Sequence, residues 1–80
     1  MTLTNEEIAR KLRAQASELA RARGNLYRVR AFRSAALAVM GLPTEVSALV
    51  AGGNASQLER VPGIGKSLAD TITAVATLRR

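Results

Sequence analysis

One short segment constrains the fold of this chain more than any other: Val61-Pro62-Gly63-Ile64-Gly65, followed directly by apolar residues at helical spacing. Pro62 fixes one backbone dihedral angle, and the two glycines tolerate positive φ and let another molecule approach the backbone closely. The segment therefore predicts a tight turn that opens into a helix. Because the first N–H groups of a helix have no intrahelical partner and carry partial positive charge, such a turn is suited to binding an anion.

A short helix is expected just before this turn, over about residues 56–60. Two helices joined in this way form a helix-hairpin-helix, an element that contacts the sugar-phosphate backbone of nucleic acid and reads no bases. We refer to residues 61–65 as the hairpin. The alternative interpretation is an ordinary connection between two helices, since Gly and Pro are common in all such turns. Of the two, the pattern favours DNA binding.

The charge balance points in the same direction. The chain of 80 residues has 12 Lys and Arg against 6 Asp and Glu, a net charge of +6. Such an excess on a small domain favours a polyanionic partner. Most of the basic residues are Arg, which binds phosphate with two parallel hydrogen bonds. A genome rich in Arg and Ala codons would give the same composition, so charge by itself supports nucleic-acid binding only weakly.

The composition also excludes several kinds of chemistry. The sequence has no Cys and no His, which removes disulfides, thiolate nucleophiles, thiol–zinc sites and imidazole acid–base catalysis. The acidic residues are scattered, which argues against a metal site made of carboxylates. No apolar run has transmembrane length, and the polar start of the chain is unlike a signal peptide. We therefore expect a cytoplasmic protein with no membrane association, located near the nucleoid if its source is bacterial.

Apolar residues recur at helical spacing along the chain, and no strand pattern interrupts them. Thr4 and Glu7 fit a capping box at the start of a first helix, which is expected over residues 5–23. Gly24 fits the C′ position that ends this helix.

A second helix is expected over residues 27–40, a short third helix would be capped by Thr44, and a last helix covers about residues 66–78. On a helical wheel of the second helix Arg28 and Arg33 flank the apolar side, whereas Arg30 points away from it. The sequence thus predicts an all-α fold: one domain over residues 1–80, a compact bundle of four to five short helices that ends in the helix-hairpin-helix. The expected core is aliphatic, with Ile8, Leu12, Ala16, Leu19, Val29, Phe32, Ala35, Ala36, Val39, Met40, Val46, Leu49, Val50, Leu58, Leu68, Ala69, Ile72, Val75 and Ala76.

Two segments resemble a known protein family. The stretch that begins at Gly24, G-N-L-Y-R-V-R-A-F-R-S-A-A, resembles "G-N-x-F-(R/K)-V-R-A-Y-R-x-A-A" in the N-terminal domain of family X DNA polymerases. The stretch that begins at Leu58, L-E-R-V-P-G-I-G, is similar to the "L-x-x-L-P-G-I-G" hairpin of the same domain. Residues 5–9 also resemble the first helix of the family. The likeness covers nearly the whole chain and is closest to bacterial members of this small domain, which is named for DNA polymerase beta.

The resemblance implies binding to gapped or nicked DNA near a downstream 5′-phosphate. In some members the domain is also a 5′-deoxyribose phosphate lyase that uses a lysine on the last helix. That position is Thr71 here, and a hydroxyl cannot form a Schiff base. A second lysine and a tyrosine of the family's phosphate pocket correspond to Ser67 and Phe32, while Arg28 keeps a basic residue. We therefore expect no lyase activity, and the missing lysine favours a small stand-alone protein over part of a longer polymerase.

In the family the hairpin also binds K⁺ or Na⁺ through carbonyl oxygens that bridge to a DNA phosphate. The resemblance places the matching carbonyls at Glu59, Val61 and Ile64. Side chains take no part in this contact, so the sequence neither supports nor opposes it beyond the hairpin itself.

The function expected from these observations is a non-catalytic, sequence-independent DNA-binding module that acts at gapped, nicked or single-stranded DNA beside a polymerase or repair protein. One alternative is the N-terminal domain of a family X polymerase with lost or displaced lyase activity. Another is a helical protein-interaction domain with exposed leucines such as Leu37 or Leu78. Basic residues gathered around the hairpin would favour DNA, whereas dispersed ones beside an apolar patch would favour a protein. The residues expected to contact DNA are Arg28, Arg30, Arg33, Gly63, Ile64, Gly65, Lys66 and Ser67.

Overall fold

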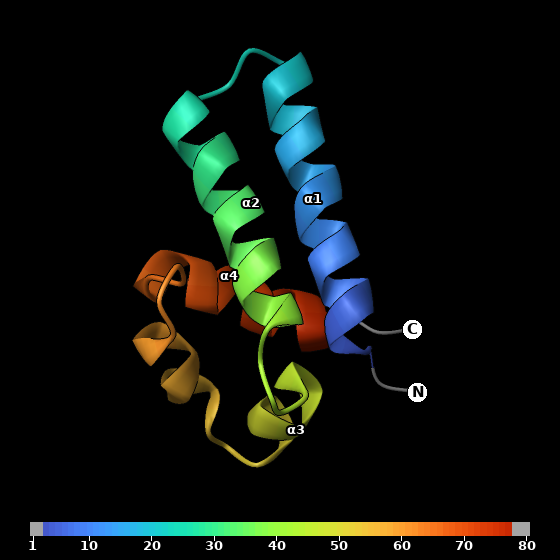
Figure 1. Cartoon of the computed structure of the whole chain (residues 1–80), viewed down its shortest axis with the longest axis vertical. Coiled ribbons are helices and arrows are strands. Elements are labelled where there is room, and N and C mark those ends of the chain that lie inside the picture. Colours follow the sequence, from blue (N-terminus) through green and yellow to red (C-terminus); the bar gives the residue numbers. More distant parts are fainter. Residues whose placement is uncertain (1–2, 78–80) are drawn as a thin grey trace.

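The computed structural model describes residues 3–77, which form helices and no strand (Figure 1). The all-α prediction is confirmed. The last helix was expected to reach residue 78, and that final position, Leu78, lies outside the described residues. The segments in chain order are α1 (Asn5–Arg21), α2 (Leu26–Met40), α3 (Val46–Ala51), the 3₁₀ helix η1 (Ala55–Arg60) and α4 (Lys66–Thr77).

The longest helices, α1 and α2, run antiparallel along the length of the molecule, and α4 crosses behind them (Figure 1). α3 and η1 form a smaller layer at the end opposite the α1–α2 turn. All five segments contribute to one aliphatic core. Its fully buried large side chains are Ile8, Leu12, Val39, Val46, Leu58 and Ile72. No helix within residues 3–77 combines the length and the apolar character needed to cross a membrane.

Most of the predicted core is buried, with one clear exception. Met40 is 48% exposed, because it is the last residue of α2 and the chain turns away there toward α3. Leu42, two residues later, packs against the core. Leu19, Leu49 and Val50 are only partly buried at its edge.

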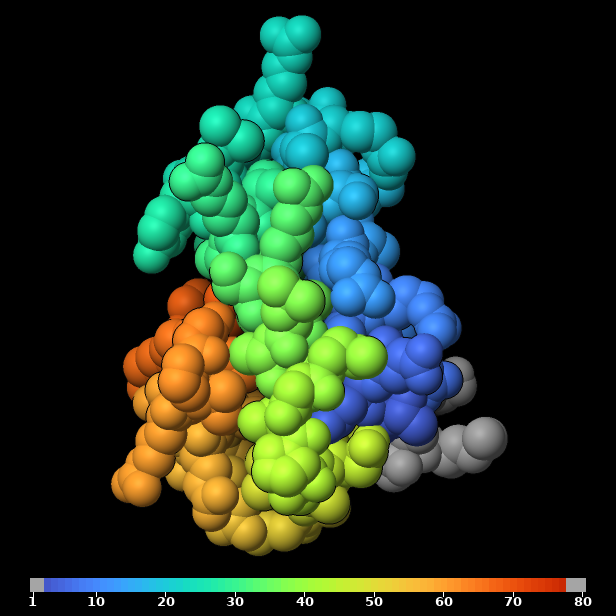
Figure 2. All heavy atoms as spheres, viewed as in Figure 1, coloured from blue at the N-terminus to red at the C-terminus, as the bar shows by residue number. Residues whose placement is uncertain are grey.

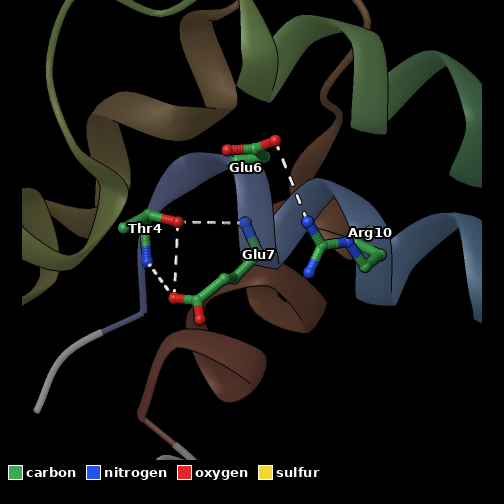
Figure 3. A network of polar contacts seen from close by, with 4 residues as sticks. All are labelled: Thr4, Glu6, Glu7 and Arg10. Carbon is green, nitrogen blue, oxygen red and sulfur yellow. Dashed lines mark hydrogen bonds and ion pairs between the residues drawn. The ribbon is translucent and has the colours of Figure 1, made fainter.

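The start of α1 has the predicted capping box (Figure 3). The hydroxyl of Thr4 accepts a hydrogen bond of 3.1 Å from the Glu7 N–H, and the carboxylate of Glu7 accepts one of 2.8 Å from the Thr4 N–H. Arg10 lies one turn from Glu6, with 3.8 Å between the charged atoms. Both of these side chains are exposed, so the ion pair adds little stability.

The end of α1 differs from the prediction. The helix stops at Arg21, and the residue with left-handed backbone is Arg23, at φ 59°, rather than Gly24. The Gly24 N–H donates to the Leu19 carbonyl at 2.7 Å, and the Arg23 N–H donates to that of Ala20 at 3.1 Å, which is a Schellman motif. Gly24 is therefore the C″ residue, one position beyond the expected one. A Cβ atom there would lie 3.1 Å from the Leu19 carbonyl oxygen, so close packing accounts for this glycine.

The predicted cap of α3 is also wrong. The N-cap residue is Glu45 instead of Thr44, and no side chain of its own segment caps the helix. The partner comes from the far end of the sequence, because Asn5 accepts a hydrogen bond of 2.7 Å from the Val46 N–H. At α2 the cap is local: the Asn25 side chain accepts from the Tyr27 N–H, which starts the helix at Leu26, one residue earlier than expected.

Candidate nucleic-acid interface

The hairpin is a tight turn anchored in the core. The Ile64 N–H donates to the Val61 carbonyl at 2.9 Å, and Gly63 has φ +93°, which an L side chain rarely adopts. Pro62 and Gly63 at the two central positions are typical of a type II turn. The Ile64 side chain is only 3% exposed and fixes the turn to the rest of the domain.

The hairpin also packs directly on α2. A Cβ atom on Gly63 would lie 3.6 Å from the Ser34 carbonyl oxygen and 3.7 Å from the Ala38 Cβ atom. The loop is therefore held at a fixed position beside the middle of α2, and the start of α4 is held with it.

Gly65 has a different role from Gly63. It does not have positive φ, so only Gly63 uses the conformational freedom that both glycines allow. A Cβ atom on Gly65 would meet nothing within 4 Å, so packing inside the domain does not account for a glycine at this position. Its carbonyl accepts from the Ala69 N–H at 2.8 Å, which makes Gly65 the N-cap of α4.

The first N–H groups of α4 point out of the helix without partners. Within the described residues, those of Lys66, Ser67 and Leu68 donate no hydrogen bond, and neither does that of Gly65. The predicted set needs one correction: the Ile64 N–H is used in the turn and is not available to a ligand. What remains is a row of free donors at the positive end of a helix dipole.

These donors open onto a groove of about 700 Å³ between the hairpin and α2, which we call the groove. In Figure 2 the surface is hollowed at the left edge, where the first turns of α2 overhang the segment that leads into α4. Three cationic side chains and no acidic ones line the groove, so its electrostatic potential favours an anion. The lining residues are Tyr27, Arg28, Arg30, Ala31, Phe32, Ser34, Gly63, Ile64, Gly65, Lys66, Ser67 and Leu68.

The groove brings together seven of the eight residues expected to contact DNA and leaves out Arg33, which is exposed but does not line it. Arg30, expected to point away from the apolar side of α2, does line it. The helical wheel places Arg30 only relative to the apolar side of α2, and it contains no information about where the hairpin packs.

Arg28 lines the groove beside Phe32. Its guanidinium carbon is 5.5 Å from the centre of the Phe32 ring, a cation–π arrangement. Phe32 itself is only 4% exposed, so its ring packs against the Arg28 guanidinium group and presents little surface to a ligand. Arg28 and Phe32 also border a smaller groove on the α1 side, lined in addition by Gln15, Glu18, Leu19 and Ala22.

Sequence reasoning missed two polar side chains of the groove. Tyr27 is 78% exposed at the start of α2, and Ser34 lies beside Gly63. The signal for Tyr27 was available, since aromatic side chains in basic grooves stack on the bases of single-stranded nucleic acid. The signal for Ser34 was not, because only the packing of the hairpin on α2 places this residue there.

The resemblance to family X polymerases assigned residues of this chain to catalytic and cation-binding positions. The structure arranges them as follows. The Thr71 hydroxyl donates to the Ser67 carbonyl of its own helix at 3.2 Å, and Thr71 does not line the groove. The Val61 carbonyl accepts from Ile64, while within residues 3–77 no hydrogen bond reaches the carbonyls of Glu59 and Ile64. The same residues contain no group of three or more acidic, His or Cys side chains that would hold a metal ion.

One of the two leucines expected to be exposed is exposed: Leu37 lies on α2 with 71% of its surface accessible. The other, Leu78, lies outside the described residues. Arg10 and Arg21 on α1 lie apart from the groove and are paired with Glu6 and Glu18. The basic residues without such partners are thus partly gathered at the hairpin and partly dispersed.

A family model described as a helix-hairpin-helix domain matches residues 3–77 of the chain. The chain belongs to this family, which indicates a DNA-binding domain in general terms. No curated protein and no solved structure matches it.

Proposed function

We propose that this helix-hairpin-helix domain is a non-catalytic module that binds the phosphate backbone of DNA and favours gapped or nicked DNA with a 5′-phosphate. The observation that carries the proposal is the groove, in which free N–H groups at the start of α4 face the side chains of Arg28, Arg30 and Lys66. Such donors hold phosphate oxygens and make no distinction between bases.

The geometry supports a DNA strand that passes over the hairpin. Gly65 leaves room for a phosphate to approach the backbone, and the N–H groups of Lys66 and Ser67 follow directly. Arg28 and Arg30 face this point from α2, across the groove. Since every contact is to phosphate, affinity should depend steeply on salt and only slightly on sequence.

The preference for a strand end rests on charge. A terminal phosphate monoester carries about −1.5 to −2 charges at pH 7, whereas a phosphate inside a strand carries one. A groove with three cationic side chains and no acidic ones gains more from the terminal group. The resemblance to family X polymerases leads to the same substrate class, and it suggests a bacterial protein that acts in the cytoplasm at the nucleoid, beside a polymerase or repair protein.

The absence of lyase chemistry is part of the proposal. A Schiff base needs a neutral amine near the sugar, and the corresponding position holds the Thr71 hydroxyl, bonded within its own helix. Lys66 is the one lysine that lines the groove, and it lies exposed at the start of α4.

A monovalent cation fits the hairpin. Two of the three carbonyls in question, those of Glu59 and Ile64, have no hydrogen-bond donor within the described residues. Pro62 has no N–H and so cannot close a turn onto the Glu59 carbonyl. When bound, K⁺ or Na⁺ would bridge these carbonyls to a DNA phosphate.

The test is fluorescence anisotropy on three labelled DNAs: intact duplex, single strand, and a gapped duplex with a downstream 5′-phosphate. Each is titrated at low and near-physiological salt. We expect tightest binding to the gapped duplex and weaker binding when its 5′-phosphate is replaced by a hydroxyl. Equal affinity for all three DNAs would limit the function to general backbone binding. No binding at low salt would overturn the proposal and favour a protein partner, with exposed Leu37 as the first residue to examine.

A further inference from the structure

The turn between α1 and α2, residues 22–25, contains an arginine in an unfavourable backbone conformation. Arg23 is the one residue other than Gly with positive φ in the part of the chain that the structure describes, at 59°. For a residue with a Cβ atom this conformation costs free energy, because the Cβ atom comes too close to the following carbonyl oxygen. Within residues 3–77 its side chain makes no hydrogen bond and no ion pair that would offset this cost.

The same protein contains a direct comparison. α3 ends in the same Schellman pattern, with the Asn54 N–H donating to Leu49 at 2.8 Å and the Gly53 N–H donating to Val50 at 3.1 Å. The left-handed residue there is Gly53, at φ +77°. The stability of the turn therefore does not account for arginine at the corresponding position of α1.

The surroundings of Arg23 are cationic. Glu18 is the nearest acidic residue in sequence, and Arg21 already pairs with it. Residues 21–30 contain Arg21, Arg23, Arg28 and Arg30 and no acidic residue. An arginine placed there at a cost in stability raises the positive potential at this end of the molecule, which is unfavourable in the free protein and favourable beside a polyanion.

The turn also continues the line of the groove. The groove runs from Gly63, beside Ser34, along α2 to Tyr27 near the start of that helix, and residues 22–25 follow at the end of the molecule (Figure 1). From Ser34 to Leu26 a helix rises roughly 12 Å at about 1.5 Å per residue. A duplex strand carries one phosphate per ~3.4 Å of its axis, so the turn lies roughly three to four phosphates from the hairpin.

We propose that Arg23 is a second DNA contact, which binds a backbone phosphate about three to four nucleotides from the one held at the hairpin. The inference rests on the proposed DNA-binding function and extends it: the module grips one strand at two points, the hairpin and the α1–α2 turn. Position 23 has arginine, although its backbone conformation favours glycine, because the arginine charge binds the phosphate at the α1–α2 turn.

The experiment uses Arg23→Gly in the full chain, with Arg13→Ala as the matched control. Arg13 is exposed, lies on α1, lines neither groove and has no ion-pair partner within the described residues. Thermal melts and anisotropy titrations on a gapped duplex at several salt concentrations are measured for wild type and both variants.

We expect Arg23→Gly to raise the melting temperature by about 4–8 °C, since glycine relieves the left-handed conformation. The same variant should bind DNA about fivefold more weakly, with a salt slope lower by about one, whereas Arg13→Ala stays close to wild type. Arg23→Lys, which keeps the charge, should retain most of the affinity.

Equal affinities for Arg23→Gly and Arg13→Ala would overturn the second contact while leaving the hairpin contact in place. A wild type that binds no DNA would instead remove the proposed function itself. Binding to vesicles of anionic lipid that depends on Arg23, with no effect of Arg23 on DNA, would assign the turn to a membrane surface and contradict the proposal.

Discussion

The side-chain oxygen of Asn5 accepts a hydrogen bond of 2.7 Å from the backbone N–H of Val46, across 41 residues of sequence. The amide nitrogen of Asn5 donates to the Thr44 carbonyl at 2.9 Å, and the Asn5 N–H donates to the Glu45 carboxylate, also at 2.9 Å. Asn5 is only 7% exposed and is the one buried polar residue among those described. The start of α1 and the start of α3 thus cap each other, which fixes the layer below α1 and α2.

Asn5→Ala should lower the free energy of unfolding by about 2–3 kcal/mol, because it leaves the buried Val46 N–H without a partner and also removes the part-buried hydrogen bond to the Thr44 carbonyl. Urea denaturation followed by circular dichroism measures this. The control is Asn25→Ala, which removes an exposed cap from α2 and should cost about 1 kcal/mol. Equal losses for the two variants would show that the link between α1 and α3 adds nothing beyond an ordinary cap.

The two hairpin glycines should respond differently to alanine. Gly63→Ala forces a side chain into φ +93° and should destabilise the domain by roughly 1–2 kcal/mol. Gly65→Ala meets open space, and its loss of N-cap preference is offset by lower entropy of the unfolded chain, so the net change should stay within about 0.5 kcal/mol. Thermal melts of both variants test this, and a large loss for Gly65→Ala would contradict it.

DNA affinity, unlike stability, should be sensitive to a side chain at position 65. Gly65→Val places a branched side chain where a phosphate would approach the free N–H groups of α4, and affinity should fall about tenfold or more. Arg10→Ala trims an exposed side chain that already pairs with Glu6, so its effect should be small. Anisotropy on gapped DNA decides the matter, with circular dichroism to show that both variants are folded. Equal losses of DNA affinity in Gly65→Val and Arg10→Ala would show that the hairpin is not part of the interface.

Two arginines of α2 provide a matched pair. Arg30 and Arg33 are both exposed and carry the same charge, but Arg30 alone lines the groove. Arg30→Ala should weaken DNA binding about fivefold more than Arg33→Ala and lower the salt slope by about one. If the two variants bind equally, general charge and not the groove determines affinity.

Incubation with DNA that contains an abasic site, followed by borohydride, should give no covalent adduct. A Schiff base requires a lysine amine at the sugar, and Thr71 has none. Gel electrophoresis under denaturing conditions detects such an adduct. An adduct that disappears in Lys66→Ala would show that the lysine at the start of α4 acts in place of the missing one, and the non-catalytic assignment would be wrong.

Features that depend on neighbours in sequence were predictable. The Thr4–Glu7 capping box, the helical spacing of Ile8, Leu12 and Ala16, and the Pro-Gly turn before α4 all involve residues within about one or two helical turns, so the pattern contains the whole interaction. The end of α1 is a limiting case. Gly24 was recognised as a terminator, but its place in the motif depends on a close contact with Leu19.

Features that depend on distant segments were not predictable in the same way. The cap of α3 was assigned to Thr44 because that residue is local, whereas Asn5 provides it after the chain has folded back. Arg30 and Arg33 were both expected to contact DNA, and only the packing of the hairpin beside α2 separates Arg30, which lines the groove, from Arg33, which does not. Met40 was assigned to the core by the same periodicity, and the end of α2 leaves it half exposed.

The amino-acid sequence by itself determined that this protein is helical, where its main helices lie, and that a Pro-Gly hairpin with an exposed helix start is its most distinctive site. It did so because capping, turn formation and amphipathic spacing are short-range interactions. The tertiary structure decided which side chains share the groove, that Ile64 uses its N–H internally while Gly65 leaves space open, and that Arg23 holds the conformation of a glycine. These depend on how α2 packs against the hairpin and how α1 ends, and packing between distant segments is set by the whole core rather than by any local pattern.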